Sequence, residues 1–255
     1  MEITFLGTGT SQGVPIIGCQ CPVCQSEDER DKRLRSSVLI SHKGSQFIID
    51  VGPDFRQQML REKVDKLDFV LLTHSHKDHT GGLDDIRAFN YLNQKAMDVY
   101  ANRFTAEALV KDFYYIFDGN DYPGLPKLDL HVVEQQEFEV NNIKIQPIEV
   151  QHYDMCILGY RIAGFAYITD AKQITEKELE KLTGLNVLVI NALRIQEHYS
   201  HFNLEEALQI VKYLAPKYVY FTHISHNLAL YAQSKQLLPE GVELAYDGLK
   251  IRMKD

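Results

Sequence analysis

Residues 67–79, Leu67-Asp68-Phe69-Val70-Leu71-Leu72-Thr73-His74-Ser75-His76-Lys77-Asp78-His79, decide the fold of this chain. An apolar, strand-like segment ends in a run that offers four metal-binding side chains within six residues. Imidazole nitrogens and carboxylate oxygens are ligands that zinc and similar divalent ions accept. Two such ions side by side generate hydroxide at neutral pH and stabilise a phosphoryl group. The run therefore predicts metal-dependent hydrolysis.

Composition places the chain among globular proteins of ordinary size. It has 255 residues, of which 45% are hydrophobic, enough for one large domain or two small ones. The formal net charge is −8 and the sequence pI is about 5.7, so the surface has no general attraction for nucleic acid. No apolar run reaches the length of a bilayer span, and residues 1–6 are typical of a strand rather than of a signal peptide. We expect a cytoplasmic protein with neither a membrane nor a nucleic-acid partner.

Short apolar segments alternate with amphipathic ones, and no repeat, low-complexity tract or Gly/Ser-rich linker divides the chain. Strands come early in each half and helices toward the ends, which predicts strands packed in two layers with helices outside. The order of the strands is left open by the sequence. We expect strands near residues 1–6, 38–41, 46–51, 69–72, 99–101, 128–133, 137–140, 143–150, 158–162, 165–169, 187–191, 218–222, 243–246 and 249–252. We expect helices near residues 54–62, 81–93, 105–113, 175–182, 204–213 and 227–238.

Three further polar residues come directly after apolar, strand-like segments: His152, Asp170 and His223. Any one of them alone would be interpreted as a turn or cap residue, and Asp170 before Ala171 is typical of a helix cap. Because the same pattern occurs three times, we interpret all three as candidate metal ligands.

The four cysteines are unevenly placed. Cys19, Cys21 and Cys24 fall within six residues, whereas Cys156 stands alone. In a reducing compartment such a tight cluster indicates a metal site more often than a disulfide framework. Cys156 lies in an apolar segment, so we expect it to be a buried packing residue.

The complete ligand pattern resembles that of the metallo-β-lactamase superfamily of dinuclear metallohydrolases, over nearly the whole chain. The resemblance implies a four-layer αβ/βα sandwich, with two mixed β-sheets packed face to face, helices outside, and the site at the edge between the sheets. It implies that one metal is held by His74, His76 and His152. The other metal is then held by Asp78, His79 and His223, with Asp170 bridging the two ions.

The first thirty residues indicate which branch of this superfamily the chain resembles most. Residues 6–15, LGTGTSQGVP, lead into the cysteine cluster in a way that resembles the PhnP-like cyclic phosphodiesterase branch of carbon–phosphorus lyase (phosphonate) metabolism. That branch holds a structural zinc with three such cysteines and a histidine, and the matching histidine here is His226. Three thiolates and one imidazole form a closed tetrahedral zinc site, which would support the loop that carries His223.

From this resemblance we expect a single hydrolase domain over residues 1–255, with a structural zinc-binding segment at about residues 18–25. The cofactors are then two catalytic divalent ions, zinc or manganese, and one structural zinc.

A proton donor is expected beside the metals. In the resembling phosphodiesterases a histidine at the position of His201 faces the site and serves proton transfer, and an ordinary imidazole pKa suits protonation of a leaving alkoxide. His198 is the competing candidate. We therefore name Asp78 and His201 as the catalytic residues.

Two other segments are assigned with the help of the resemblance. The glycine-rich loop of residues 7–13 matches no Walker or dinucleotide fingerprint, but its place in the family makes Ser11 a candidate substrate contact. Asp50, in Asp50-Val51-Gly52, is predicted to support a ligand rather than to bind metal itself.

The leading hypothesis is a metal-dependent phosphodiesterase for small or cyclic phosphodiesters, of the 2′,3′-cyclic nucleotide or 1,2-cyclic ribose phosphate type. Activated water attacks phosphorus, both metals stabilise the charge on the phosphoryl oxygens, and His201 protonates the departing oxygen. The expected partner is a small-molecule phosphodiester, and the resemblance suggests a homodimer.

The same ligand pattern is compatible with several different functions. Within the superfamily they are a tRNA 3′-processing endonuclease, a thioesterase, lactonase or lactamase, and a protein of pyrroloquinoline quinone biosynthesis. A flavodiiron-type redox enzyme carries glutamate where His76 stands, so histidine favours hydrolysis. From another class comes a non-catalytic, zinc-stabilised binding protein, which would need only four closed ligand positions.

Overall fold

Seven strands form each of two β-sheets in the computed structural model, which describes residues 1–119 and 122–253. The first sheet comes from the N-terminal half and is closed at one edge by the last strand of the chain, in the order β14-β1-β2-β3-β4-β5-β6. Pairing is antiparallel from β14 to β3 and parallel from β3 to β6. The strands are β1 (Glu2–Gly7), β2 (Ser37–His42), β3 (Ser45–Ile49), β4 (Phe69–Leu71), β5 (Met97–Ala101), β6 (Leu128–Val132) and β14 (Lys250–Arg252).

The second sheet has the order β13-β12-β11-β10-β9-β8-β7. Its first strands along the chain, β7 to β10, form antiparallel pairs, and β10 to β13 are parallel. Both sheets are therefore mixed. The strands are β7 (Phe138–Val140), β8 (Ile143–His152), β9 (Met155–Ile162), β10 (Phe165–Ile168), β11 (Val187–Asn191), β12 (Tyr218–Thr222) and β13 (Val242–Leu244).

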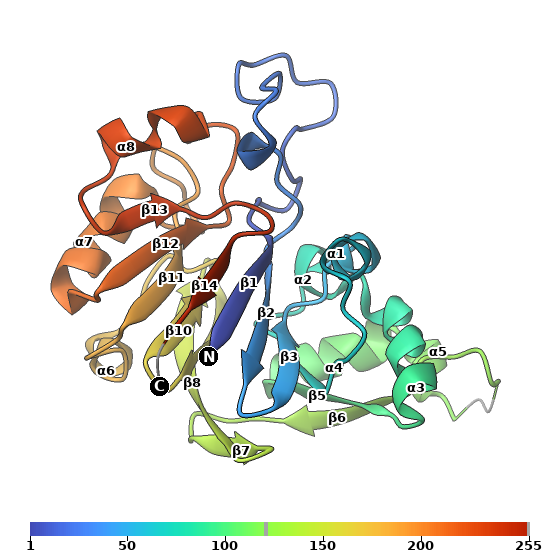
Figure 1. Ribbon diagram of the computed structural model, residues 1–255. Coiled ribbons are helices and arrows are strands. Elements are labelled where there is room, and N and C mark those ends of the chain that lie inside the picture. Colours follow the sequence, from blue (N-terminus) through green and yellow to red (C-terminus); the bar gives the residue numbers. More distant parts are fainter. Residues whose placement is uncertain (120–121, 254–255) are drawn as a thin grey trace.

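Helices cover the outer faces, α1 to α5 on the side of the first sheet and α6 to α8 on the side of the second (Figure 1). The α-helices are α1 (Phe55–Glu62), α2 (Lys77–Thr80), α3 (Arg87–Asn93), α4 (Arg103–Asp112), α5 (Tyr114–Phe117), α6 (Glu176–Glu180), α7 (Leu204–Leu214) and α8 (Ser234–Leu237). The 3-10 helices are η1 (Glu29–Asp31), η2 (Leu83–Ile86) and η3 (Tyr231–Gln233).

The core between the sheets is rich in aromatic side chains. Phe5 and Phe69 from the first sheet and Tyr160 and Tyr167 from the second are fully buried in one cluster. The Tyr160 hydroxyl donates a hydrogen bond of 2.7 Å to the carbonyl oxygen of Leu72, so it joins the two sheets next to the histidine-rich run. Each sheet also packs against its own helices through a separate apolar cluster. The predicted αβ/βα sandwich is confirmed.

The prediction of one helix over residues 227–238 is wrong in its length. Only the short η3 and the single-turn α8 form there. The backbone N–H of Tyr231 donates a hydrogen bond of 2.7 Å to the Asp31 carboxylate. This N–H is therefore used in a tertiary contact and not in a helical hydrogen bond. Conversely, the run after β4 contains the one-turn helix α2, where we expected only a loop.

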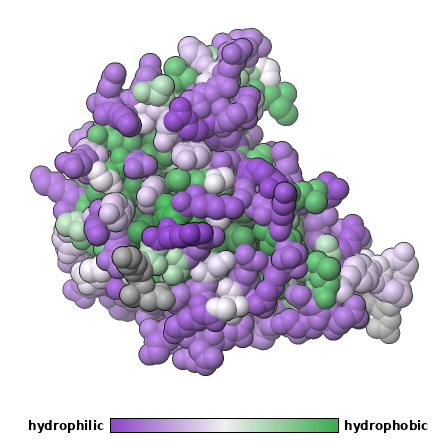
Figure 2. All heavy atoms as spheres, in the orientation of Figure 1, coloured by the Kyte–Doolittle hydropathy of each residue, from purple (hydrophilic) through white to green (hydrophobic). Residues whose placement is uncertain are grey.

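Among the described residues, no helix is long and apolar enough to cross a membrane. The face seen in Figure 2 carries mostly hydrophilic residues, with apolar residues scattered among them.

Candidate metal centre

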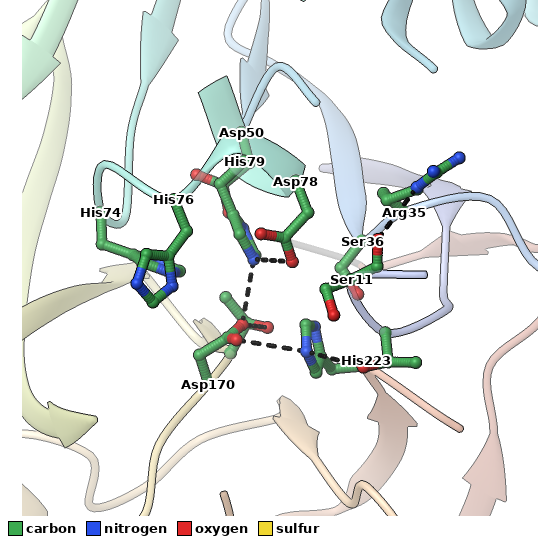
Figure 3. A network of polar contacts seen from close by, with 12 residues as sticks. Ser11, Arg35, Ser36, Asp50, His74, His76, Asp78, His79, Asp170 and His223 are labelled. Carbon is green, nitrogen blue, oxygen red and sulfur yellow. Dashed lines mark hydrogen bonds and ion pairs between the residues drawn. The ribbon is translucent and has the colours of Figure 1, made fainter. Parts of the chain in front are cut away.

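The predicted ligands meet at one end of the sandwich because each lies at, or shortly after, the end of a strand that ends there. β4 leads into residues 74–79, β8 ends at His152, β10 precedes Asp170, and β12 precedes His223. Asp170 and His223 both adopt the left-handed backbone conformation, with φ of +58° and +54°, which is costly for non-glycine residues and typical of functional sites. In Figure 3 the labelled ligand side chains from these segments point toward a common centre.

The first group of possible ligands is His74, His76 and His152, whose ligand atoms lie within 4.8 Å of one another. His74 Nε2 is 3.0 Å from His76 Nδ1. The Nδ1–H of His152 donates to the carbonyl oxygen of Ser200 at 2.9 Å, which leaves Nε2 with a lone pair for a cation.

The second group of possible ligands is Asp78, His79, Asp170 and His223, whose ligand atoms also lie within 4.8 Å of one another. His79 Nε2 lies 3.2 Å from oxygens of both Asp78 and Asp170, yet this buried atom makes no hydrogen bond of acceptable geometry. Asp170 also lies 3.2 Å from His223 Nε2. An imidazole nitrogen left without a hydrogen bond between two carboxylates fits a place where a cation completes the coordination.

The electrostatics of the cluster favour positive charge at its centre. Burial lowers the pKa of His74 well below its ordinary value and that of His223 to about 3, so both are neutral and have a lone pair to donate. Burial also acts on His79, but the carboxylates of Asp78, Asp170 and Asp50 outweigh it and raise its pKa well above the ordinary value. The field that favours a proton on this ring also favours a metal ion.

Asp50 lies behind the ligands. Its carboxylate is fully buried, accepts a hydrogen bond from the backbone N–H of Thr73 at 2.8 Å, and lies 2.7 Å from His79 Nδ1. A carboxylate in this position orients the ring so that Nε2 faces the centre. The structure thus gives Asp50 the supporting place that the sequence predicts.

His201 lies at the edge of the cluster. Its Nε2 is 3.0 Å from Asp170 Oδ1, and its Nδ1 is 2.9 Å from the Ser200 hydroxyl. His198 is farther out: its Nδ1 is 3.2 Å from His201 Nδ1. Burial lowers the pKa of His198 to about 4, so this imidazole is neutral near pH 7.

A pocket of about 500 Å³ opens onto the cluster, a volume typical of small-molecule sites. The predicted Ser11 lines it, and the Ser11 carbonyl oxygen accepts a hydrogen bond of 3.2 Å from Arg35. The pocket also contains residues that the sequence did not single out, among them Tyr153 and Tyr199. A second hollow of about 620 Å³ lies at the opposite end of β8 and contains none of the cluster residues.

The three clustered cysteines converge on His226. Their Sγ atoms lie 3.3, 3.3 and 3.5 Å from its Nδ1, for Cys19, Cys21 and Cys24 respectively. A tetrahedral zinc with ordinary bond lengths would place sulfur and nitrogen roughly 3.5 Å apart, so the spacing fits that ion. A hydrogen bond from the Cys24 backbone N–H is the main cause that lowers the pKa of Cys21 to about 6, which favours the thiolate.

The expectation for Cys156 was wrong. This cysteine lies on β9 but is exposed, because it points away from the core while its neighbour Ile157 points inward.

A family model described as "Beta-lactamase superfamily domain" matches residues 45–224. Together with the two sheets and the clusters above, this defines a metallo-β-lactamase-fold hydrolase with a His/Asp metal site. A crystal structure described as that of a new diphosphatase from the PhnP family is 41% identical and superposes with a TM-score of 0.91, covering 98% of this chain and 96% of the other. The chain belongs to the PhnP family.

Two more proteins resemble this chain. A Porphyromonas gingivalis protein named octanoyltransferase is 40% identical over this whole chain, but the chain spans only about half of that protein, 54%. The zinc-bound PqqB of Methylobacterium extorquens superposes with a TM-score of 0.79 over 99% of this chain and all of the other. Its identity is only 19%, so this likeness shows the fold alone.

Proposed function

We propose that this protein is a metal-dependent phosphodiesterase that acts on small or cyclic phosphodiesters. One observation carries the proposal: seven His and Asp side chains form two adjoining groups of possible metal ligands, five of the seven line an open pocket, and His201 lies 3.0 Å from Asp170. A purely structural site needs four closed positions, whereas this donor set suits two ions and leaves room for a substrate.

Divalent ions bound here would supply activated water and neutralise charge on the phosphoryl oxygens. The protein itself contributes the rest of the site. Asp50 fixes the His79 ring, and the carbonyl oxygen of Ser200 fixes His152, so the ligand atoms are oriented before substrate arrives. His201 lies at the edge of the cluster and lines the pocket, where it would serve as the proton donor to the departing oxygen.

A second candidate is a diphosphatase, because the 41%-identical PhnP-family protein is described as one. Water attacks phosphorus in both reactions, and the two differ in the leaving group, an alcohol in one case and a phosphate in the other. A tRNA-processing nuclease is disfavoured by the net charge of −8.

Replacement of Asp170 tests the proposal. Asp170→Ala should abolish turnover of bis-(p-nitrophenyl) phosphate by the metal-loaded protein while the far-ultraviolet circular dichroism stays unchanged. The control Asp129→Ala, on the exposed side of β6, should keep wild-type turnover. Full activity in Asp170→Ala would refute the assignment.

A substrate panel then separates phosphodiesterase from diphosphatase activity. It contains 2′,3′-cyclic nucleotides, 1,2-cyclic ribose phosphate, linear diesters and diphosphates. Thioesters and β-lactams are included because a thioesterase or a lactamase would hydrolyse these and leave every phosphate compound intact.

A further inference from the structure

Two tyrosines stand at the mouth of the metal pocket without being buried. Tyr153 is 63% exposed and Tyr199 is 72% exposed, yet both line the pocket. Their ring centroids are 5.6 Å apart and their planes meet at 82°, so the two rings form a corner. Exposed aromatic rings gain little by packing only on each other, whereas at a pocket they offer faces to a planar ligand.

The backbone holds both rings in place. Tyr153 occupies the two-residue turn between β8 and β9, directly after His152, with a left-handed φ of +52°. Such a conformation is costly for an aromatic residue and persists where the position matters. Tyr199 is held by His198, whose ring stacks on it at 4.4 Å with an angle of 25° between the planes.

Ring contacts connect this corner to the metal cluster. His198 lies 5.0 Å from His201 between ring centroids, and His201 contacts Asp170. A ligand that spans the pocket would therefore place its phosphate at the cluster and its other end at the tyrosines. Asp154, which also lines the pocket beside Tyr153, adds negative charge there and disfavours a second phosphate at this outer end.

We propose that Tyr153 and Tyr199 form a base-binding subsite, and that the substrate is a phosphate ester or anhydride carrying a nucleobase. This rests on the proposed function for the position of the phosphate. Stacking on tyrosine tolerates any base because every base has an aromatic face. The subsite therefore selects nucleotide substrates over sugar phosphates that lack a base.

Binding to the metal-loaded protein tests the subsite without turnover. AMP and ribose 5-phosphate share the phosphate and the ribose, and only AMP has a base. Titration calorimetry measures the affinity for each ligand. Tyr199→Ala and Tyr153→Ala should each lower the affinity for AMP about 10-fold, while the affinity for ribose 5-phosphate changes less than about twofold. Tyr199→Phe keeps the ring and should retain wild-type affinity. Tyr213→Ala, which removes a tyrosine equally exposed at 63% but placed on α7 outside the pocket, is the matched control.

A second readout uses the absence of tryptophan from the sequence. Tyr199→Trp provides a single indole at the pocket, and its fluorescence should be quenched by AMP and not by ribose 5-phosphate. Equal weakening of both ligands in the alanine variants, no preference of the wild type for AMP, or no quenching would overturn the subsite. If base-dependent binding is found but no phosphoester or diphosphate is hydrolysed, the subsite stands and the proposed function fails.

Discussion

At the scale of single residues, the site depends on which nitrogen of each ring faces the centre. His152 uses Nδ1 to bind the Ser200 carbonyl, and His79 uses Nδ1 to contact Asp50. Both rings therefore present Nε2 to the centre. The sequence places the histidines, but these supporting partners lie 48 and 29 residues away along the chain. The ring orientations follow only from the folded chain.

His201 should matter most when the leaving group is a strong base. His201→Asn should lower kcat for an alkyl phosphodiester about 100-fold, because an alkoxide needs a proton to depart. The effect should be far smaller for a p-nitrophenyl ester, whose phenolate departs without one. His131→Asn, which removes an exposed histidine of β6 outside the pocket, is the control and should change kcat little for either substrate. The same loss for both leaving groups would show that His201 has only a structural role.

Asp247 gives a pH dependence of stability that is independent of the metal cluster. It accepts hydrogen bonds of 2.8 Å from the Thr8 hydroxyl and from the Leu34 backbone N–H. Burial, opposed in part by these bonds, raises its pKa from 3.8 to about 6. Between these values the folded state keeps a proton that the unfolded state has lost, so the free energy of unfolding falls as pH rises from about 4 to 6.

Asp247→Asn should remove this dependence. The difference in the free energy of unfolding between variant and wild type should change by up to about 3 kcal/mol across that pH interval. Urea unfolding at a series of pH values measures it, with Asp65→Asn on the exposed surface as control. Parallel curves for Asp247→Asn and the wild type would contradict the prediction.

At the scale of elements, strands could be predicted because their cause is local. β11 is apolar over residues 187–190 and β8 ends at a polar residue, and both patterns can be read from a short window. The segment of residues 227–238 could not be predicted, because Asp31 binds the N–H of Tyr231 from the other end of the chain. The corner of Tyr153 and Tyr199 was missed for the same reason: each lies on its own turn, and only the fold brings them together.

The segment between β1 and β2 should depend on its cysteine site. Cys24→Ser should remove one zinc per chain and lower the melting temperature, because the ion would join this segment to the residues after β12. Turnover should fall about 10-fold, since His223 lies three residues before His226. Zinc content and thermal unfolding measure these effects, and the exposed Cys156→Ser is the control. Unchanged zinc content in Cys24→Ser would refute the structural site.

At the scale of the whole molecule, both candidate metal sites join the two sheets. The His/Asp cluster combines residues 74–79, which follow β4 of the first sheet, with ligands that follow three strands of the second. The cysteine site joins the segment before β2 to His226 after β12. An ion bound only by the folded state stabilises it by mass action, so metal removal should loosen the contact between the sheets.

Stepwise chelation should therefore separate the two sites. The cluster opens onto a pocket, whereas the cysteine site has its four positions closed by protein. A mild chelator should first remove the ions of the cluster, with complete loss of turnover and a modest fall in melting temperature. A strong chelator should then remove the third ion, with a larger fall, and added zinc should restore both properties. A melting temperature that does not respond to either chelator would show that neither site holds the sheets together.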